Sequence, residues 1–228
     1  HTICHSRKLF IEAPTGAGKT ISTVFPAVKA VGEGKADRIF YLTAKTIART
    51  VADRTFDLLR ERGLHFKTVV LTARDKICFM EESECNPDSC PYAKGHFDRI
   101  NDAIFELMTT KEHYSREEIE ACAQKYKVCP FELGLDLSLW CDVVVGDYNY
   151  LFDPVVHLMR FFETAGDYLF LIDEAHNLPG RARDMHSASL CKSVFYDAKK
   201  RLGKGKSSLK NALTKVNNCL LYTSPSPR

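Results

Sequence analysis

The stretch KLFIEAPTGAGKTISTVFPAVKAV, residues 8–31, decides the fold of this chain. Its first part, KLFIEA, is a short apolar run that predicts a buried strand at 8–13, and it ends at the turn sequence PTGAG. From Lys19 onward the apolar side chains recur at helical spacing. When a glycine-rich turn joins a strand to a helix, its backbone N–H groups and the N-terminus of the helix can face an anion. We therefore expect a phosphate-binding loop at this turn.

The predicted nucleotide-binding loop contains eight residues, which are Ala13, Pro14, Thr15, Gly16, Ala17, Gly18, Lys19 and Thr20. Glycines let the backbone close around phosphate oxygens, Lys19 can reach the β and γ phosphates, and the Thr20 hydroxyl can bind Mg²⁺. The pattern G-x-x-x-x-G-K-[ST] has Ala13 in place of its first glycine. The alternative is a glycine-rich turn with an exposed lysine, and the flanking strand and helix argue against it.

Further strands alternate with helices along the chain. Apolar runs predict strands at about 38–43, 67–73, 141–148 and 167–176. A helix is expected between the first two of these strands, with one apolar side formed by Ile47, Val51, Phe56, Leu58 and Leu59. This alternation predicts an α/β fold with a doubly wound parallel sheet. Residues 75–134 break the pattern with cysteines and two helical stretches, and we interpret them as an insertion.

The sequence LIDEAH, residues 171–176, places two carboxylates at the end of an apolar strand. Asp173 can hold the water shell of Mg²⁺ there, and Glu174 can orient and deprotonate an attacking water. Alone, these letters could be a helix start with a chance acidic pair. Their position after the Lys19 loop supports two halves of one ATPase site in the expected order.

Four of the nine cysteines share one region, with the spacing Cys78-x6-Cys85-x4-Cys90-x38-Cys129. Structural zinc sites usually contain C-x2-C pairs, which this spacing lacks, whereas iron–sulfur clusters accept looser spacing and often end in Cys-Pro. Cys122 competes with Cys129 for the fourth place, because it lies seven residues earlier on a helical pattern. If the ion were zinc, His96 and His113 could also bind it.

Composition and charge narrow the function classes. No run of 18 apolar residues occurs, so we expect no membrane span. The cysteines fit the reducing cytosol, which we expect to be of bacterial type, better than a disulfide framework. Residues 181–218 hold ten Lys and Arg against two acidic residues. That segment is either a solvated helical face or a contact for a polyanion. The start at His1 predicts missing upstream sequence, and CLLYTSPSPR at 219–228 has no periodicity and resembles a non-native tail.

Taken in order, APTGAGKT, FYLTAKTIART, the four cysteines, DVVVGDYNYLFDP and LIDEAHNL resemble the XPD/DinG family of iron–sulfur, superfamily-two DNA helicases, over about residues 8–218. The resemblance implies a RecA-like P-loop motor domain in two segments, 1–74 and 135–180. It also implies a 4Fe–4S cluster insertion at 75–134 and the start of a basic helical arch domain at 181–218. The implied activity is ATP-driven, 5′-to-3′ translocation on single-stranded or forked DNA, linked to DNA repair or replication.

The resemblance also assigns site residues. His176 would couple the nucleotide state to the motor, and four residues would contact the DNA backbone, namely Thr43, Lys45, Thr46 and Arg49. Tyr148 and Tyr150 could stack on bases, although such tyrosines are more often core residues. The family needs a second motor domain that supplies an arginine finger. No such domain follows residue 180, so we expect the chain alone to bind nucleotide poorly and to hydrolyse it slowly.

Two other functions compete with the helicase interpretation. A stand-alone P-loop NTPase with a zinc-stapled lid would bind zinc and would need further catalytic arginines. A non-catalytic nucleic-acid-binding module would use the basic segment without any dependence on ATP. Iron and sulfide analysis of anaerobically purified protein separates the zinc alternative from the helicase.

Overall fold

The computed structural model describes residues 2–14, 16–82, 84–163, 166–202 and 207–223. The chain divides into two compact units, His1–Met185 and His186–Arg228. The first unit contains every described strand and all the predicted nucleotide-site residues that the structure describes.

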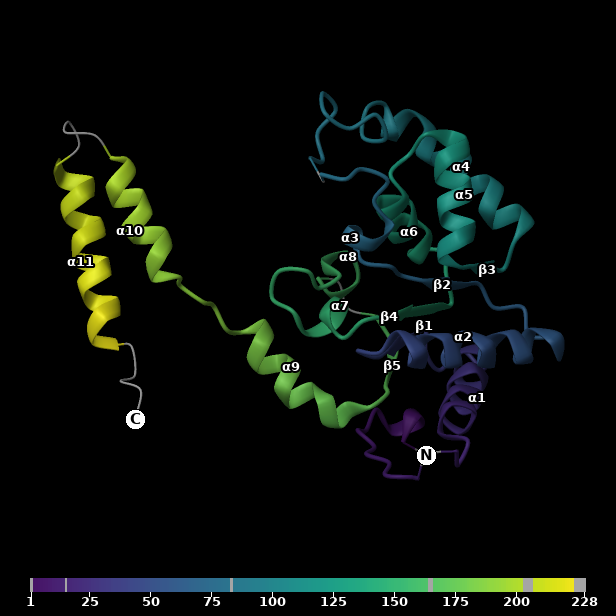
Figure 1. Cartoon of the computed structure of the whole chain (residues 1–228). Helices are drawn as coiled ribbons and strands as arrows, with labels where there is room; N and C mark the ends of the chain where they lie inside the picture. Colours follow the sequence, from purple (N-terminus) through teal and green to yellow (C-terminus); the bar gives the residue numbers. More distant parts are fainter. Residues whose placement is uncertain (1, 15, 83, 164–165, 203–206, 224–228) are drawn as a thin grey trace. The chain divides into compact units, whose positions relative to one another are not determined.

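A parallel sheet forms the centre of the first unit (Figure 1). Within the described residues its five strands are β1 (Arg38–Leu42), β2 (Thr68–Val70), β3 (His113–Tyr114), β4 (Val143–Gly146) and β5 (Tyr168–Ile172). Their spatial order is β3-β2-β4-β1-β5, and every adjacent pair is parallel. The predicted α/β class with a parallel sheet is therefore confirmed.

Helices fill most of the connections in this unit. They are α1 (Lys19–Gly32), α2 (Thr46–Glu61), α3 (Arg74–Ile77), α4 (His96–Thr110), α5 (Arg116–Tyr126), α6 (Pro130–Ser138), α7 (Asn149–Phe152), α8 (Met159–Phe162) and α9 (Leu178–Met185). Two short 3₁₀ turns, η1 (Ile3–His5) and η2 (Ala175–Asn177), complete the set that the structure describes.

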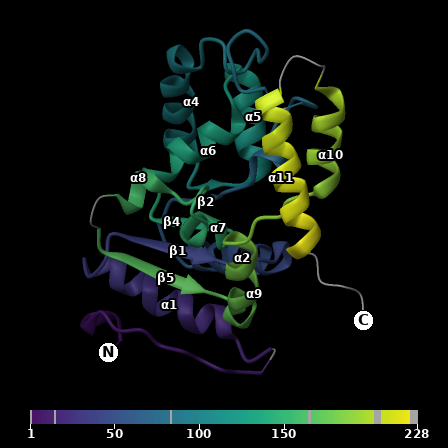
Figure 2. The ribbon, with the colours of Figure 1, turned by 90° about the vertical axis from the view of Figure 1, so that its left-hand side faces the viewer.

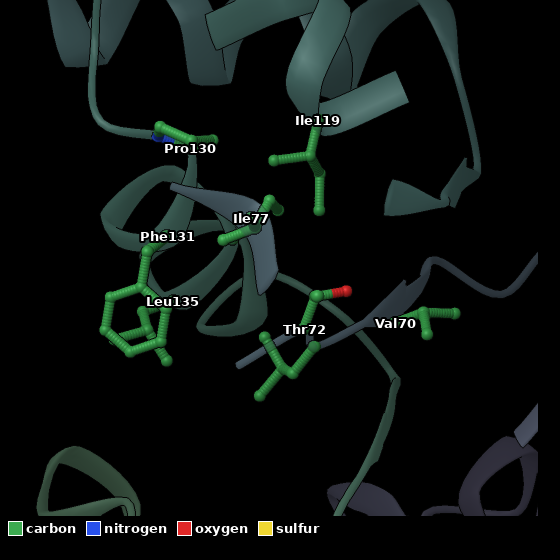
Figure 3. Close-up of a pocket in the computed structure, with 9 residues that line it drawn as sticks. Val70, Thr72, Ile77, Ile119, Pro130, Phe131 and Leu135 are labelled. Carbon is green, nitrogen blue, oxygen red and sulfur yellow. The ribbon is translucent and has the colours of Figure 1, made fainter. Parts of the chain in front are cut away.

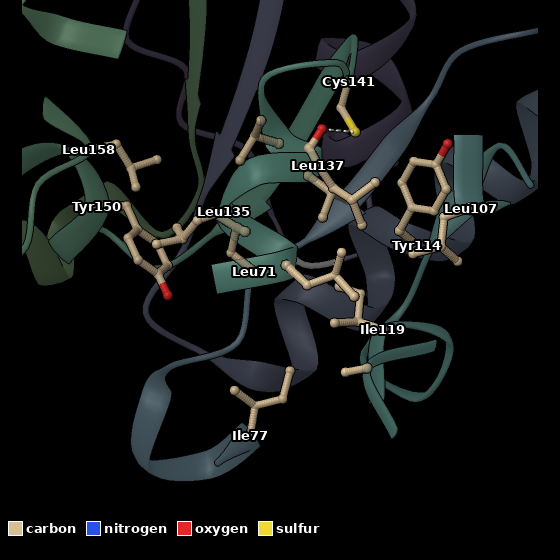
Figure 4. Packing of buried hydrophobic residues seen from close by; sticks show 14 of the residues in the cluster. Leu71, Ile77, Leu107, Tyr114, Ile119, Leu135, Leu137, Cys141, Tyr150 and Leu158 are labelled. Atoms are coloured by element: carbon tan, nitrogen blue, oxygen red, sulfur yellow. Dashed lines mark hydrogen bonds between the residues drawn. The ribbon is translucent and has the colours of Figure 1, made fainter. Parts of the chain in front are cut away.

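The two faces of the sheet are buried under different helices, as Figures 1 and 2 show. Successive strand residues point to opposite faces. On β1, Ile39 and Tyr41 therefore pack in the core with α1 and α2, while Phe40 and Leu42 pack in the larger core with α4, α5 and α6. Figure 4 shows part of the larger core, in which Leu71, Leu107, Ile119, Leu137 and other apolar side chains meet.

The predicted insertion shares its core with the sheet. Strand β3 lies inside residues 75–134 and pairs in parallel with β2. Helix α5 begins at Arg116, after Ser115, whose side chain accepts a hydrogen bond of 3.3 Å from the Glu118 N–H and caps the helix. Helix α6 continues past residue 134 and packs against β2. The insertion and the motor sheet therefore bury apolar surface in one common cluster.

The strand predicted at 8–13 does not form. Residues 7–14 have no regular secondary structure, and Phe10, at the middle of the apolar run, is 88% exposed. No backbone hydrogen bond joins this stretch to β5 in the part of the chain that the structure describes. An apolar run predicts burial only where a neighbouring element covers it, and here none does. The first strand of the sheet is instead β1.

The second unit contains two helices, α10 (Lys192–Arg201) and α11 (Ser207–Thr223), which pack against each other. Helix α11 continues to Thr223, into the segment that resembles a non-native tail. Residues 224–228 lie outside the described residues. None of the helices in the described ranges combines the length and the apolar character that crossing a membrane requires.

Candidate nucleotide site and cysteine region

The predicted phosphate loop ends where α1 begins. Gly16 and Gly18 have φ of 85° and 73°, the left-handed region that favours glycine, and Gly18 is the N-cap of α1. Lys19 and Thr20 are the first two residues of that helix, so their backbone N–H groups have no partner within it. The loop thus presents a helix N-terminus with a lysine and a hydroxyl beside it. Thr15 lies outside the described residues.

The predicted acidic pair follows β5 directly. The Asp173 backbone N–H donates to the Leu42 carbonyl at 3.0 Å, which fixes Asp173 at the carboxyl end of the sheet. Glu174 has φ of 53°, a left-handed conformation that costs a non-glycine residue on the order of 1 kcal/mol. Its backbone N–H donates to Asp173 Oδ1 at 2.9 Å. Backbone strain of this kind is concentrated at functional sites, and here it lies between two candidate catalytic carboxylates.

Tyr41 of β1 joins the loop to the acidic pair. Its hydroxyl donates to Asp173 Oδ2 at 3.0 Å, and the Thr20 side chain also hydrogen-bonds to the phenol. Burial, and then the neighbouring Asp173 carboxylate, raise the pKa of the Tyr41 phenol above its usual range. The structure therefore brings Thr20 and Asp173 to either side of one buried hydroxyl.

The Glu174 carboxylate has two basic side chains as neighbours. Lys45 Nζ lies 3.4 Å from Glu174 Oε2, and His176 Nε2 lies 3.5 Å from the same oxygen. The Lys45 and His176 side chains are 59% and 71% exposed, so both can also contact a ligand from solvent. Lys45, predicted as a DNA contact, is thus adjacent to the candidate catalytic base.

Three of the six predicted DNA contacts are buried in this structure. Thr43 and Tyr148 are fully buried, and Tyr150 is 8% exposed. The Tyr148 hydroxyl donates to the Asp173 carbonyl, and the Tyr150 ring packs in the larger core. Both tyrosines thus have the core position that the sequence analysis named as the more frequent one. Only Lys45 and Thr46 among the six are exposed.

Arg49, a further predicted DNA contact, is part of an ion cluster. Its Nη2 lies 3.6 Å from Asp147 Oδ2, and Arg181 of α9 approaches Asp147 Oδ1 to 3.1 Å. Arg181 also donates to Asn149 Oδ1 at 3.0 Å. The Nε atoms of Arg49 and Arg181 are buried without a hydrogen-bond partner in the described residues. Asp147 therefore holds α2, α7 and α9 together, a role that no sequence pattern announced.

Replacing Asp147 by alanine is expected to lower the free energy of unfolding by about 1–3 kcal/mol, because two partly buried guanidinium groups lose their only carboxylate. Asp136→Ala is the matched control, since it breaks an exposed ion pair of 2.8 Å with Arg160. That control should cost about 0–1 kcal/mol. Urea denaturation measures both values. Equal losses in the two variants would contradict a structural role for Asp147.

The four candidate cluster cysteines do not form a metal-binding group as placed. Among the described residues no three His, Cys, Asp or Glu side chains are close enough to hold one ion. Cys78 ends α3, and Cys129 is the N-cap of α6. Figure 3 shows that Ile77, Pro130 and Phe131, their sequence neighbours, line one small apolar pocket. The segments that carry Cys78 and Cys129 therefore lie side by side.

The surroundings of these thiols fit sulfur ligands of a metal cluster. Burial raises the pKa of the Cys129 thiol, and the Glu132 and Phe131 N–H groups, which donate to the sulfur, oppose that rise. Arg74 Nη1 lies 3.9 Å from Cys85 Sγ. The Cys85 and Cys129 thiols are also near enough to interact electrostatically. N–H donors and a cation at sulfur are the groups that stabilise thiolate ligands.

The alternative ligands have other partners. Cys122 is buried in the larger core and donates to the Ala103 carbonyl, with 3.6 Å between sulfur and oxygen. Burial raises the pKa of its thiol to about 11. His96 Nδ1 accepts the Cys129 N–H at 3.2 Å, and His113 Nε2 pairs with Asp53 at 2.8 Å. Cys122 thus packs as a small apolar residue.

Tyr41 is the site residue that sequence reasoning missed. It lies inside the apolar strand sequence RIFYL, where a tyrosine fits the core without any further role. The alternation of the strand could have placed it on the same face as α1. Its approach to Asp173, however, depends on the neighbouring β1 and β5, which no local pattern reveals.

Comparison with known proteins agrees with this arrangement. The family profile DEAD_2 matches residues 65–195. The Fanconi anemia group J protein homolog of Gallus gallus is 28% identical over 171 residues, which cover 68% of this chain and 14% of that protein. The XPD helicase subunit of general transcription and DNA repair factor IIH from Schizosaccharomyces pombe is 23% identical, over 84% of this chain and 29% of that protein.

Among solved structures, one described as "Truncated XPD" has a similar fold, with a TM-score of 0.59 and 21% identity. The similarity covers 92% of this chain and 59% of that one. The chain therefore spans only part of the length of each relative it matches. The chain is similar to XPD helicase subunits, and because the DEAD_2 match extends over more than half of its residues, it belongs to the DEAD_2 family.

Proposed function

We propose that this chain forms the nucleotide-binding part of an ATP-driven DNA helicase. The observation that carries the proposal is the contact of Thr20 and Asp173 with the same Tyr41 hydroxyl. It joins the start of α1, where a phosphate would bind, to the carboxylates that follow β5. A phosphate loop and an acidic strand end at one place are the two halves of a nucleotide hydrolysis site.

The proposed roles follow from the side chains. Lys19 binds the β and γ phosphates, and Thr20 and Asp173 hold Mg²⁺ directly or through its water shell. The ion supplies positive charge that neutralises the phosphate oxygens. Glu174 takes a proton from a water whose oxygen attacks the γ-phosphorus. The bond from that phosphorus to the β–γ bridging oxygen breaks, and ADP and phosphate result.

Lys45 and Thr46 are the proposed contacts to the DNA backbone. Both are exposed and lie at the start of α2, one on each side of its N-terminal boundary. Contacts to phosphate carry no sequence information, which suits a motor that moves along single-stranded or forked DNA. His176 next to Glu174 is the proposed link between the nucleotide and the motor. The proposed direction is 5′ to 3′, with a role in DNA repair or replication.

A 4Fe–4S cluster bound by Cys78, Cys85, Cys90 and Cys129 is part of the proposal. Support comes from the N–H groups and the guanidinium around Cys129 and Cys85, and from the core position of the competing Cys122. When bound, such a cluster supplies four strong bonds that tie distant segments together. The chain's own contribution is to hold Cys129 at the start of α6 and Cys78 at the end of α3.

The domain assignment stays a proposal as well. Residues 1–74 and 135–180 form the motor domain, residues 75–134 carry the cluster, and residues 181–218 begin an arch domain. The structure divides the chain into two compact units after Met185, and α9 lies in the first of them. A second motor domain, from the same protein, is the proposed source of the arginine finger.

A strand-displacement assay tests the helicase activity. It uses this protein and any longer form that the same gene encodes, with duplexes that carry either a 5′ or a 3′ single-stranded tail. We expect ATP-dependent unwinding of the 5′-tailed duplex by the longer form. ATP hydrolysis without unwinding of either duplex would refute the helicase and favour a stand-alone NTPase.

A further inference from the structure

We propose that Tyr41 is a positioning residue that holds Thr20 and Asp173 in place for a single Mg²⁺ ion. This inference rests on the proposed ATP site and adds a residue to it. Tyr41 does not touch the nucleotide in the proposed arrangement. It acts through the two side chains on either side of its hydroxyl.

The Tyr41 hydroxyl interacts with both side chains. It donates its proton to Asp173 Oδ2 at 3.0 Å, and the Thr20 side chain also interacts with the phenol. Thr20 and Asp173 therefore meet at one buried hydroxyl. Because both contacts join at one atom, a shift of either side chain disturbs the other.

Burial makes Tyr41 a rigid support. The residue is 2% exposed, and its ring packs in the core with Phe56 of α2 and Val24 of α1. The packed ring fixes the position of the hydroxyl beside the Asp173 carboxylate.

Asp173 is fixed by three hydrogen-bond donors in total. Glu174 N–H donates to Oδ1, Tyr41 donates to Oδ2, and Tyr148 donates to the backbone carbonyl. Two of these three donors are side chains, Tyr41 and Tyr148. Of the two, Tyr41 is the one that donates to the Asp173 carboxylate and so orients it. A metal site needs ligands whose rotamers are locked by such supporting contacts.

Tyr41→Phe removes the hydroxyl and keeps the ring. The affinity for a fluorescent ATP analogue is measured in excess EDTA and in excess Mg²⁺. We expect unchanged affinity in EDTA, because the phosphate loop is intact. In Mg²⁺ the affinity should be about five- to tenfold lower than that of the unsubstituted protein, the usual effect of one buried hydrogen bond.

Tyr114→Phe is the matched control, since Tyr114 is fully buried and donates its hydroxyl to the Lys111 carbonyl at 3.1 Å, away from the site. It should bind ATP like the unsubstituted protein in both conditions. In an Asp173→Asn background, Tyr41→Phe should have no further effect on the gain from Mg²⁺, because the carboxylate that it orients is gone. Circular dichroism checks that each variant folds.

The outcomes separate the inference from the proposed function. Equal losses in EDTA and in Mg²⁺, or no loss in either, would overturn the role of Tyr41 and leave the ATP site standing. An additive loss in the Asp173→Asn background would do the same. If the unsubstituted protein binds no ATP, the proposed function fails and the inference with it. A loss confined to Mg²⁺ supports both.

Discussion

Cys129→Ala is expected to abolish the proposed iron–sulfur cluster in protein purified without oxygen. A 4Fe–4S cluster is held by four thiolates, and loss of one ligand leaves an iron corner open to solvent. We expect iron and inorganic sulfide to fall from about four of each per chain to well under half of that value, and the broad visible absorption to disappear. Metal analysis and the absorption spectrum measure this loss.

Cys122→Ala is the matched control for that experiment. Cys122 lies seven residues earlier, is buried, and hydrogen-bonds to the Ala103 carbonyl. Its replacement should cost some stability through lost packing and leave the iron content unchanged. Iron retained in Cys129→Ala and lost in Cys122→Ala would show that the fourth ligand was assigned to the wrong cysteine. Zinc in the unsubstituted protein, without iron, would refute the cluster.

Lys19→Ala is expected to weaken ATP binding by about 10- to 100-fold. Hydrogen bonds to charged groups contribute roughly 1.5–3 kcal/mol, and Lys19 is the cation at the start of α1, beside the predicted phosphate position. The remaining affinity should come from the backbone N–H groups of the loop and the helix N-terminus. Equilibrium titration with a fluorescent ATP analogue measures the change.

Lys29→Ala provides the control for charge. Lys29 lies on the same helix, is exposed, and pairs with Glu33 at 3.7 Å, so its loss changes the net charge by the same amount. A surface pair of this kind contributes little to stability, and we expect ATP affinity within twofold of the unsubstituted protein. A comparable loss in both variants would mean that ATP is attracted by overall charge and not by the loop.

The alternation of strands and helices could be predicted because each apolar run has the length and composition of its element. Which face of each element is buried could not be predicted in the same way. On α2 the sequence favoured a side with Ile47 and Val51, yet these residues are 79% and 45% exposed. Of the predicted side, Phe56 is fully buried, and it packs together with Ala52 because the buried face is set by contact with α1 and β4. The apolar run at residues 8–13 is exposed for the same reason, since burial is set by neighbouring elements and not by the run itself.

Local patterns also identified the ends of the nucleotide site but not the contacts between them. The loop before Lys19 and the acids after β5 are each contained in a few consecutive residues. Tyr41, Asp147 and Arg181 act across elements that are far apart in the sequence. The tyrosines of GDYNYLF illustrate a further limit, because aromatic rings suit both base stacking and a core, and only burial separates the two.

The central claim is that the loop at Lys19 and the carboxylate of Asp173 form a single site for ATP and Mg²⁺. Isothermal titration of ATP into the protein, with Mg²⁺ and with EDTA, tests it most directly when Asp173→Asn is titrated alongside. We predict one ATP per chain, bound more tightly with Mg²⁺ by the unsubstituted protein, and no gain from Mg²⁺ in Asp173→Asn. An unsubstituted protein that binds no ATP, or an equal gain from Mg²⁺ in both proteins, would contradict the claim.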